Sequence, residues 1–569
     1  MARTVGIGIQ NFAKLIENRY FYVDKTDFIR EWWESGDDVT LITRPRRFGK
    51  TLNMNMLERF FSIEYAGRGE VFEGLSIWEK EAYRGLQGTY PVIMLSFASV
   101  KETTFENARK KLCHIITELY NRYDHLLDRK LLNEKEMEFY RNVSADMEDY
   151  TATESLKVMS GFLERYYGKG VIILLDEYDA PMQEAYVYGY WEELAAFTKS
   201  LFNATFKTNP YLERAVMTGI TRVSRESIFS DLNNLDVVTV TSEKYAECFG
   251  FGEAEVWEAL KEYGMYHTRQ RVKDWYDGFT FGNSGDIYNP WSILNYIRTG
   301  KLSAYWANTS SNSLANKLIR EGSSEIKISM EQLLKGGTIY REIDEQVVFD
   351  QLETDENAVW SLFLASGYLK MKSYVMNEET GEDLYELALT NKEVQIMFRK
   401  MIKKWFSGSG TVYNSFLKAL MRDDVKSMNA YMNRVALATF SYFDSGRNPS
   451  METQPERFYH GFVLGLAVEL ADRYIITSNR ESGFGRYDVM MEPKNETDPA
   501  VIMEFKVRDP GEERSLEDTA NGALKQIEEQ QYETDLESRG IPCGRIRKYG
   551  FAFDGKKVLI KEYRGKSGE

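Results

Sequence analysis

Runs of apolar residues separated by polar turns recur through the N-terminal part of the chain and predict buried strands. The run at 39–43 is β-branched and apolar, and after a loop Leu52, Met56 and Phe60 recur every four positions, as on one face of a helix. Further runs of the strand type lie at 91–97, 171–175 and 214–219. Buried strands that alternate with helices are typical of an α/β domain with a parallel sheet.

The loop after the first strand has the composition of a phosphate-binding turn, because residues 44–51 read Arg-Pro-Arg-Arg-Phe-Gly-Lys-Thr. In such a turn Gly49 lets the backbone approach a phosphate, Lys50 reaches the β and γ phosphates, and the Thr51 hydroxyl ligates Mg²⁺. The N-terminus of the following helix adds its positive dipole end. The first glycine of the pattern GxxxxGK[ST] falls on Arg44, so a basic turn in front of a helix is the alternative for this loop alone.

The strand-like run at 171–175 ends in two acids, Asp176 and Glu177. Ligands of parallel sheets bind at the carboxyl ends of the strands. We therefore expect Asp176 to hold Mg²⁺ through water and Glu177 to polarise the water that attacks the γ phosphate. Arg222 follows the run at 214–219 and either senses the γ phosphate or forms a surface salt bridge.

Two strand-like segments near the C-terminus, 486–491 and 500–507, flank a polar loop and predict a hairpin centred near Glu496. This hairpin places Asp488 opposite Glu504, with Cβ atoms about 4.5–5.5 Å apart. Two carboxylates at that distance repel each other unless a divalent cation lies between them.

The residues around this pair have the chemistry of metal-assisted phosphodiester cleavage. Asp488 and Glu504 are candidates to bind Mg²⁺, which activates water and shields the scissile phosphate. Lys506 shares the face of Glu504 because strand side chains alternate, and it would orient the nucleophile or stabilise the developing charge. Gln526, in a helical pattern at 523–527, would fix a phosphate or a metal-bound water. Without its context, the D…ExK pattern is also compatible with a solvated hairpin carrying cross-strand ion pairs.

The middle of the chain, from about 310 to 445, predicts helices, and the apolar residues Val394, Met397, Phe398 and Met401 follow helical spacing. By composition, 278–290 is a loop and 445–455 is a linker. The expected domains are an ATPase domain at 1–245, a lid or winged or helical subdomain at 246–325, a helical connector at 326–445 and a nuclease-like domain at 446–569.

Composition limits the class of protein. The chain has 569 residues and a net charge of −15, which counts against a protein that coats nucleic acid non-specifically. Its three cysteines form no CxxC pair, and its four histidines show no metal-ligand spacing. Neither a signal peptide nor an apolar run long enough to span a membrane is visible, so we expect a cytoplasmic protein with no membrane partner.

Several N-terminal motifs, read together, resemble the bacterial AAA-ATPase-like family. They are YVDKT at 22–26, TRPRRFGKT at 43–51, LDEYD at 175–179, WYDGF at 275–279 and YNPWS at 288–292. An arginine-rich Walker A motif without its first glycine is usual in that family, so the resemblance implies ATP as cofactor. The residues it assigns to ATP and its Mg²⁺ are Arg46, Arg47, Phe48, Gly49, Lys50, Thr51, Asp176 and Arg222.

The C-terminal segments at 456–462, 478–488, 502–507 and 523–527 resemble the PD-(D/E)xK nuclease superfamily. The resemblance implies a mixed α/β restriction-endonuclease-like fold behind the P-loop domain. It makes Asp488, Glu504 and Lys506 the central triad and Gln526 the helix residue, with Glu456 as a further acid and Glu481 as its rival.

These motifs lead to two hypotheses. The first is an ATP-gated, Mg²⁺-dependent nuclease that acts on DNA. One form of this hypothesis is a homo-oligomer in which Arg222 or Arg225 serves as an arginine finger. The second is an ATP-dependent signalling or scaffold switch whose nuclease-like domain binds nucleic acid or a partner without cleavage.

Overall fold

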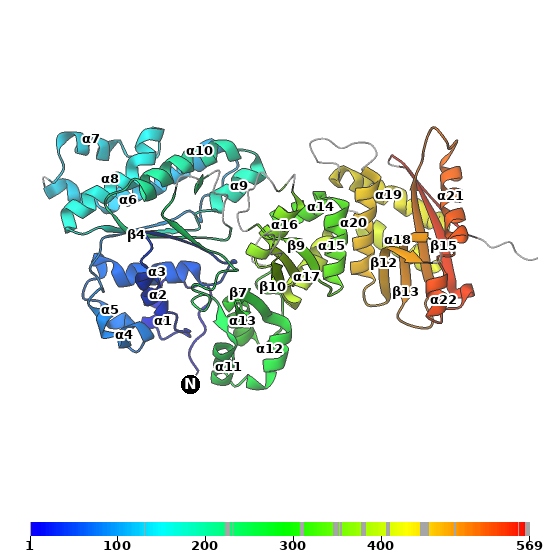
Figure 1. Ribbon diagram of the computed structural model, residues 1–569, viewed down its shortest axis with the longest axis horizontal. Helices are drawn as coiled ribbons and strands as arrows, with labels where there is room; N and C mark the ends of the chain where they lie inside the picture. The colour runs from blue at the N-terminus through cyan, green and yellow to red at the C-terminus, as the bar shows by residue number, and fades with distance from the viewer. Residues whose placement is uncertain are drawn as a thin grey trace, which may run out of the picture. The chain divides into compact units, whose positions relative to one another are not determined.

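The computed structural model (Figure 1) describes most of the chain. The described residues are 2–129, 131–221, 228–229, 232–307, 312–344, 352, 355–376, 383–405, 410–443, 454–482, 485–555 and 557–563. Two compact units are present, and neither is continuous in sequence. The first contains 1–311 and 340–394, and the second contains 312–339 and 395–569.

A parallel five-stranded sheet forms the centre of the first unit, with the order β2-β3-β4-β1-β5. The four strands predicted from sequence are confirmed, and β5 is an addition. Because all strands run the same way, their carboxyl ends meet at one edge. The strands are β1 (Val39–Thr43), β2 (Val92–Ser96), β3 (Val171–Asp176), β4 (Leu212–Gly219) and β5 (Leu235–Val238).

Helices cover both faces of this sheet (Figure 1). On one side lie α1 (Phe12–Glu17), α2 (Asp27–Ser35) and α3 (Lys50–Phe61), and on the other α6 (Phe105–Arg122), α8 (Asp149–Tyr167) and α10 (Trp191–Phe202). The predicted helix after the phosphate-binding loop is therefore confirmed as α3. Shorter helices complete this part, namely α4 (Ser76–Glu79), α5 (Glu81–Arg84), α7 (Glu134–Asn142) and α9 (Ala180–Tyr188).

A second, smaller layer of the first unit contains the three-stranded sheet β6-β8-β7. Its strands are β6 (Phe251–Gly252), β7 (Asp277–Phe281) and β8 (Ser284–Tyr288), and its helices are α11 (Glu253–Glu262), α12 (Arg269–Tyr276) and α13 (Pro290–Thr299). The prediction of a loop over 278–290 is wrong, because β7 and β8 form a hairpin there. The turn between them uses Gly282, whose φ of 54° suits glycine.

The region expected to be helical, about 310–445, is mostly helical and also contains a sheet of the order β10-β11-β9 that we did not predict. The apolar stripe of Val394, Met397, Phe398 and Met401 is buried, as expected. The elements here are α14 (Ser313–Glu321), α15 (Ser324–Leu334), β9 (Ile339–Glu342), α16 (Glu356–Ala365), β10 (Leu369–Met376), β11 (Asp383–Leu389), α17 (Lys392–Trp405), α18 (Gly410–Arg422) and α19 (Val425–Phe443).

The C-terminal part of the second unit is a mixed sheet with the order β12-β13-β14-β15-β16. Strands β14 and β15 are parallel, and the other neighbouring pairs are antiparallel. The elements are α20 (Gln454–Glu469), β12 (Tyr474–Ser482), β13 (Gly485–Pro493), β14 (Ala500–Val507), α21 (Leu516–Glu529), α22 (Thr534–Ser538), β15 (Ile546–Asp554) and β16 (Lys557–Glu562).

The predicted linker at 445–455 falls almost entirely outside the described residues. Within the part of the chain that the structure describes, no helix combines the length and the apolar composition that crossing a membrane requires.

Candidate active sites

The phosphate-binding loop joins the end of β1 to the start of α3. Gly49 lies directly before the helix with φ 89°, a conformation that a side chain would strain. Within the described chain, the backbone N–H groups of Arg46, Arg47, Phe48 and Gly49 donate to no protein acceptor. Such a run of unpaired N–H groups at a helix N-terminus is suited to binding an anion.

Lys50 and Thr51 connect this loop to the acid at the end of β3. The Lys50 ammonium is buried and donates to the carbonyls of Arg44 (2.8 Å) and Pro45 (2.9 Å). Burial lowers the pKa of Lys50 from its usual value. The Thr51 hydroxyl donates to Asp176 Oδ2 at 2.7 Å, and the Thr218 hydroxyl donates to Asp176 Oδ1. The residues predicted to ligate Mg²⁺, Thr51 and Asp176, therefore lie in direct contact.

Glu177 follows Asp176 and has φ 52°, which is unusual for a residue with a side chain. Strained backbone of this kind is concentrated at functional sites. Burial and the neighbouring Asp176 charge raise the pKa of Glu177. Asp179 then fixes the loop after β4, because its Oδ2 accepts from the N–H groups of Ile220 and Thr221 at 2.9 Å each. Arg222 and Arg225, further along that loop, lie outside the described residues.

Arg44, which stands where the pattern has its first glycine, is fully buried. Its guanidinium donates to the carbonyls of Thr43 (2.9 Å) and Thr239 (2.6 Å) and stacks on the ring of Phe281 at 4.5 Å. Burial lowers the pKa of Arg44 to about 9. Its role in this structure is to join the loop to the segment after β5, which the sequence pattern did not reveal.

The three residues between Pro45 and Gly49 differ in what they can offer a ligand. Arg46 and Arg47 are exposed, with Arg47 over the ring of Trp291 at 4.5 Å. Phe48 is buried between Phe279 and Phe281, so only its backbone faces the loop.

A set of hydrogen bonds that the sequence did not predict, called the brace below, holds the carbonyl of Arg46. This carbonyl accepts from Asn289 Nδ2 (3.1 Å) and from the ring N–H of Trp306 (2.9 Å). The backbone N–H of Trp306 donates to buried Glu393 at 2.6 Å, and the Ser292 hydroxyl donates to the same carboxyl at 2.8 Å. Since these residues are far apart in sequence, no local pattern could have found them.

The C-terminal candidate site is built on the hairpin of β13 and β14. Val489 pairs with Met503 and Met490 with Ile502, so the register is centred on residue 496 and the next residues outward are Asp488 and Glu504. The predicted juxtaposition of the two acids is therefore confirmed. Lys506 follows two positions later on the same face of β14.

The two acids have different surroundings. Asp488 Oδ2 accepts from the N–H of Phe505 at 2.8 Å. Glu504 is buried, its Oε1 accepts from Gln526 Nε2, and its Oε2 has no hydrogen-bond partner among the described residues. Gln526 also donates to the Tyr532 hydroxyl at 3.0 Å, so α21 contacts Glu504 and the turn after α21 contacts Gln526. That Gln526 fixes a phosphate or a metal-bound water stays a prediction.

The two carboxyls also hold protons more tightly than free acids do. Burial raises the pKa of Asp488 to about 6. Burial and the Asp488 charge raise the pKa of Glu504 to about 8, against the opposing charge of Lys506. A buried oxygen without a partner and two mutually repelling acids fit a divalent cation, which would satisfy both.

Among the described residues, no group of three or more His, Cys, Asp or Glu side chains is arranged to hold a metal ion. The expected further acid, Glu456, lies on α20, but its side chain and that of its rival Glu481 are outside the described set. Asp488 and Glu504 are therefore the candidate metal ligands of this domain whose side chains the structure describes.

Two family models match this chain, one over the N-terminal part that contains the phosphate-binding loop and one over the C-terminal part that contains Asp488 and Glu504. Residues 6–229 match the family described as "Predicted AAA-ATPase", and residues 454–563 match the PD-(D/E)XK nuclease superfamily. The chain joins a predicted AAA-ATPase domain to a PD-(D/E)XK nuclease superfamily domain. One relative aligns along almost the whole length of both chains. It is the "Uncharacterized protein in vnfD 5'region" of Azotobacter chroococcum mcd 1, 23% identical over 97% of each chain.

The two family matches divide the candidate residues between two chemistries. The AAA-ATPase domain contains the loop at 46–51, Asp176 and Glu177, and the nuclease superfamily domain contains Asp488, Glu504, Lys506 and Gln526. The geometry brings together the residues within each set.

Proposed function

We propose that the protein is an ATP-gated nuclease that hydrolyses DNA phosphodiester bonds with Mg²⁺. The observation that carries this proposal is the closeness of Asp488 on β13 to Glu504 on β14, where the charges of Asp488 and Lys506 both act on Glu504 and Gln526 donates to it. The family of the C-terminal domain supports a nuclease-type hydrolase, and that of the N-terminal domain supports an ATPase.

In the AAA-ATPase domain, the unpaired N–H groups at 46–49 would bind the phosphates of ATP. Lys50 would exchange its two carbonyl partners for the β and γ phosphates, and Thr51 with Asp176 would hold the Mg²⁺ of the nucleotide. Glu177 would take a proton from the attacking water, and its raised pKa makes it a stronger base than a free carboxylate.

In the nuclease domain, Asp488 and Glu504 would hold Mg²⁺ once both are ionised. The cation supplies Lewis-acid stabilisation of the phosphate charge. The Lys506 ammonium, whose charge acts on both Asp488 and Glu504, would orient a water molecule or stabilise charge on the phosphate. Gln526 would hold Glu504 in its ligating orientation.

The gating part of the proposal rests on the brace at Arg46 and on helix α17. Glu393, which binds Trp306 of the brace, lies in the first turn of α17, and the same helix continues to Trp405. A nucleotide that displaces the Arg46 carbonyl would therefore act on the start of a helix whose later residues belong to the second unit.

The test is cleavage of plasmid and single-stranded DNA by the full chain with Mg²⁺, with and without ATP. We expect cleavage that needs Mg²⁺ and is changed by ATP, that is lost in Asp488→Ala and Lys506→Ala, and that no longer responds to ATP in Lys50→Ala. Equal cleavage in all these proteins would contradict the assignment.

The alternative, an ATP-dependent switch without cleavage, is favoured by one observation, that only two metal-ligating acids are described in the nuclease domain. DNA binding that persists without cleavage in the same assay, together with nucleotide-dependent oligomerisation, would support it.

A further inference from the structure

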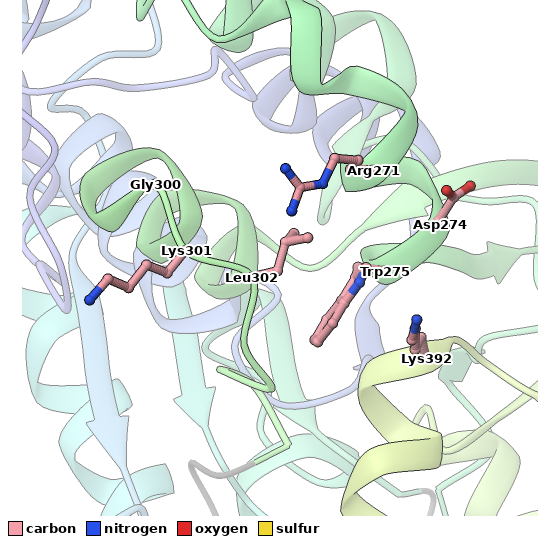
Figure 2. A pocket seen from close by; sticks show the side chains of 7 residues that line it. All are labelled: Arg271, Asp274, Trp275, Gly300, Lys301, Leu302 and Lys392. Atoms are coloured by element: carbon pink, nitrogen blue, oxygen red, sulfur yellow. The ribbon is translucent and has the colours of Figure 1, made fainter. Parts of the chain in front are cut away.

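A pocket of about 620 Å³ lies in the first unit, and none of its lining residues belongs to either candidate site. Figure 2 shows its lining, which comes from α12, from the turn after α13 and from the first residue of α17. Its volume is in the range of small-molecule sites, about 300–1,000 Å³. The lining residues are Arg271, Asp274, Trp275, Gly300, Lys301, Leu302 and Lys392.

The charge of the pocket is opposite to that of the protein. Three of its side chains are cations and one is an acid, whereas the whole chain carries −15. The acid, Asp274, accepts a hydrogen bond from Gln270 on the same helix at 2.9 Å. Within the described residues, the guanidinium of Arg271 and the ammonium groups of Lys301 and Lys392 form no ion pair, so their charges are not neutralised by the protein.

The pocket also has a flat apolar wall. In Figure 2 the guanidinium of Arg271 and the side chain of Leu302 point toward each other, the ring of Trp275 is drawn between Leu302 and Lys392, and Lys301 extends away from them. The Lys392 ammonium lies over the Trp275 ring, 5.2 Å from its centroid. An indole ring next to cations can stack on a planar ring of a ligand while the cations bind its negative charge.

Trp275 is held in place by the fold rather than by a ligand. It packs against the cluster of buried residues that includes Val272, Tyr276 and Tyr296. The neighbouring Tyr276 hydroxyl donates to the Ser303 carbonyl at 2.9 Å, and Asn391 donates to the Tyr276 carbonyl at 3.2 Å. The three segments of the lining are therefore tied together, and the pocket is preformed.

We propose that this pocket binds a nucleotide unit, a planar base with at least one phosphate, at a site separate from the phosphate-binding loop. Trp275 and Leu302 receive the base, and Arg271 and Lys392 receive the phosphate. A free nucleotide and a single nucleotide of a DNA strand present the same chemistry. The site does not depend on the proposed ATP or nuclease chemistry, because it shares no residue with either.

The test uses the full chain carrying Lys50→Ala and Asp488→Ala. The first substitution prevents nucleotide binding at the phosphate-binding loop, and the second prevents cleavage of the probe. Two probes are titrated, thymidine monophosphate and a fluorescent oligothymidylate of about ten residues, within the site sizes known for single-strand binding. Binding is followed by quenching of tryptophan fluorescence and by anisotropy.

We expect saturable binding that Arg271→Ala weakens about tenfold or more, since a hydrogen bond to a charged group contributes about 1.5–3 kcal/mol. Lys392→Ala should weaken it several-fold. Trp275→Phe should keep most of the affinity and remove part of the fluorescence quenching. Arg141→Ala, which removes an exposed arginine on α7 that has no ion pair among the described residues, is the matched control and should leave the affinity unchanged.

Equal affinity for both probes identifies a free nucleotide as the ligand, and binding of the oligothymidylate alone identifies a DNA strand. Absence of binding by both probes, or equal weakening by Arg271→Ala and Arg141→Ala, would overturn the proposal. Circular dichroism and thermal unfolding of each variant separate loss of the site from loss of the fold.

Discussion

The two candidate sites treat their acids in opposite ways. In the AAA-ATPase domain, both oxygens of Asp176 accept hydrogen bonds from hydroxyl groups, those of Thr51 and Thr218. In the nuclease domain, the charge of Asp488 acts on Glu504, and one buried oxygen of Glu504 has no hydrogen-bond partner among the described residues. The Asp176 carboxylate therefore has a hydrogen bond to each oxygen without a cation, and the Glu504 carboxylate does not.

This difference indicates which site depends more strongly on a divalent cation. Hydroxyl donors already compensate the burial of Asp176, so Mg²⁺ there would arrive with the nucleotide. The acid pair has no such compensation, and a cation would remove both the repulsion and the unsatisfied oxygen.

Asp488→Asn should reduce DNA cleavage about a thousandfold, because a metal ligand supplies several kcal/mol of charge stabilisation and each 1.36 kcal/mol corresponds to tenfold. ATP binding should not change. The measurement is the single-turnover cleavage rate together with nucleotide affinity. Asp472→Asn, the same charge change at an exposed position of the same unit, is the control. A loss of similar size in Asp472→Asn would contradict the account.

Gln526→Leu should weaken binding of Mg²⁺ or Mn²⁺ about 10- to 100-fold, the usual effect of removing a group that orients a metal ligand. Its amide is the described donor to Glu504 Oε1. Isothermal titration with Mn²⁺ measures this, and Gln530→Leu at the end of the same helix is the control. Unchanged affinity in Gln526→Leu would show that Glu504 needs no support from α21.

Metal affinity of the nuclease domain should rise with pH between about 6 and 8, by up to about tenfold per pH unit. The sign follows from the raised pKa values of Asp488 and Glu504, about 6 and about 8. Below these values the acids are protonated and must release protons to bind a cation, and above them they are already ionised. Titrations in buffers of different ionisation heat count the released protons. Affinity that is constant across this range would mean that both acids are ionised without metal.

Trp306→Phe should lower ATP affinity about fivefold, since it removes one hydrogen bond of about 1 kcal/mol to the loop carbonyl of Arg46 and keeps the ring packing against Phe279. Trp360→Phe is a close control, because the buried ring N–H of Trp360 has no partner among the described residues. Equal effects of the two substitutions on ATP affinity would leave the brace without a role.

The sequence predicted the parts of both sites that local patterns determine. The strand, turn and helix around Gly49 and Lys50 follow from apolar periodicity, and the pairing of Asp488 with Glu504 follows from the centre of a hairpin. The outcome for Arg222 stays a prediction, because that residue lies outside the described chain.

What the sequence could not predict depends on contacts between distant segments. Arg44 matched a phosphate-loop position, yet its burial against Phe281 is a tertiary effect. The brace from Trp306 to the Arg46 carbonyl spans 260 residues of sequence. The hairpin of β7 and β8 was missed because its glycines and polar residues resemble a loop by composition.

The central claim is that Asp488 and Glu504 hold one divalent cation between them. The most direct measurement is the stoichiometry of Mn²⁺ bound without nucleotide, by electron paramagnetic resonance, in the full chain and in Asp488→Asn, both with Lys50→Ala. The account predicts a bound ion in the first protein that is lost in the second. The same stoichiometry and affinity in both proteins would contradict it.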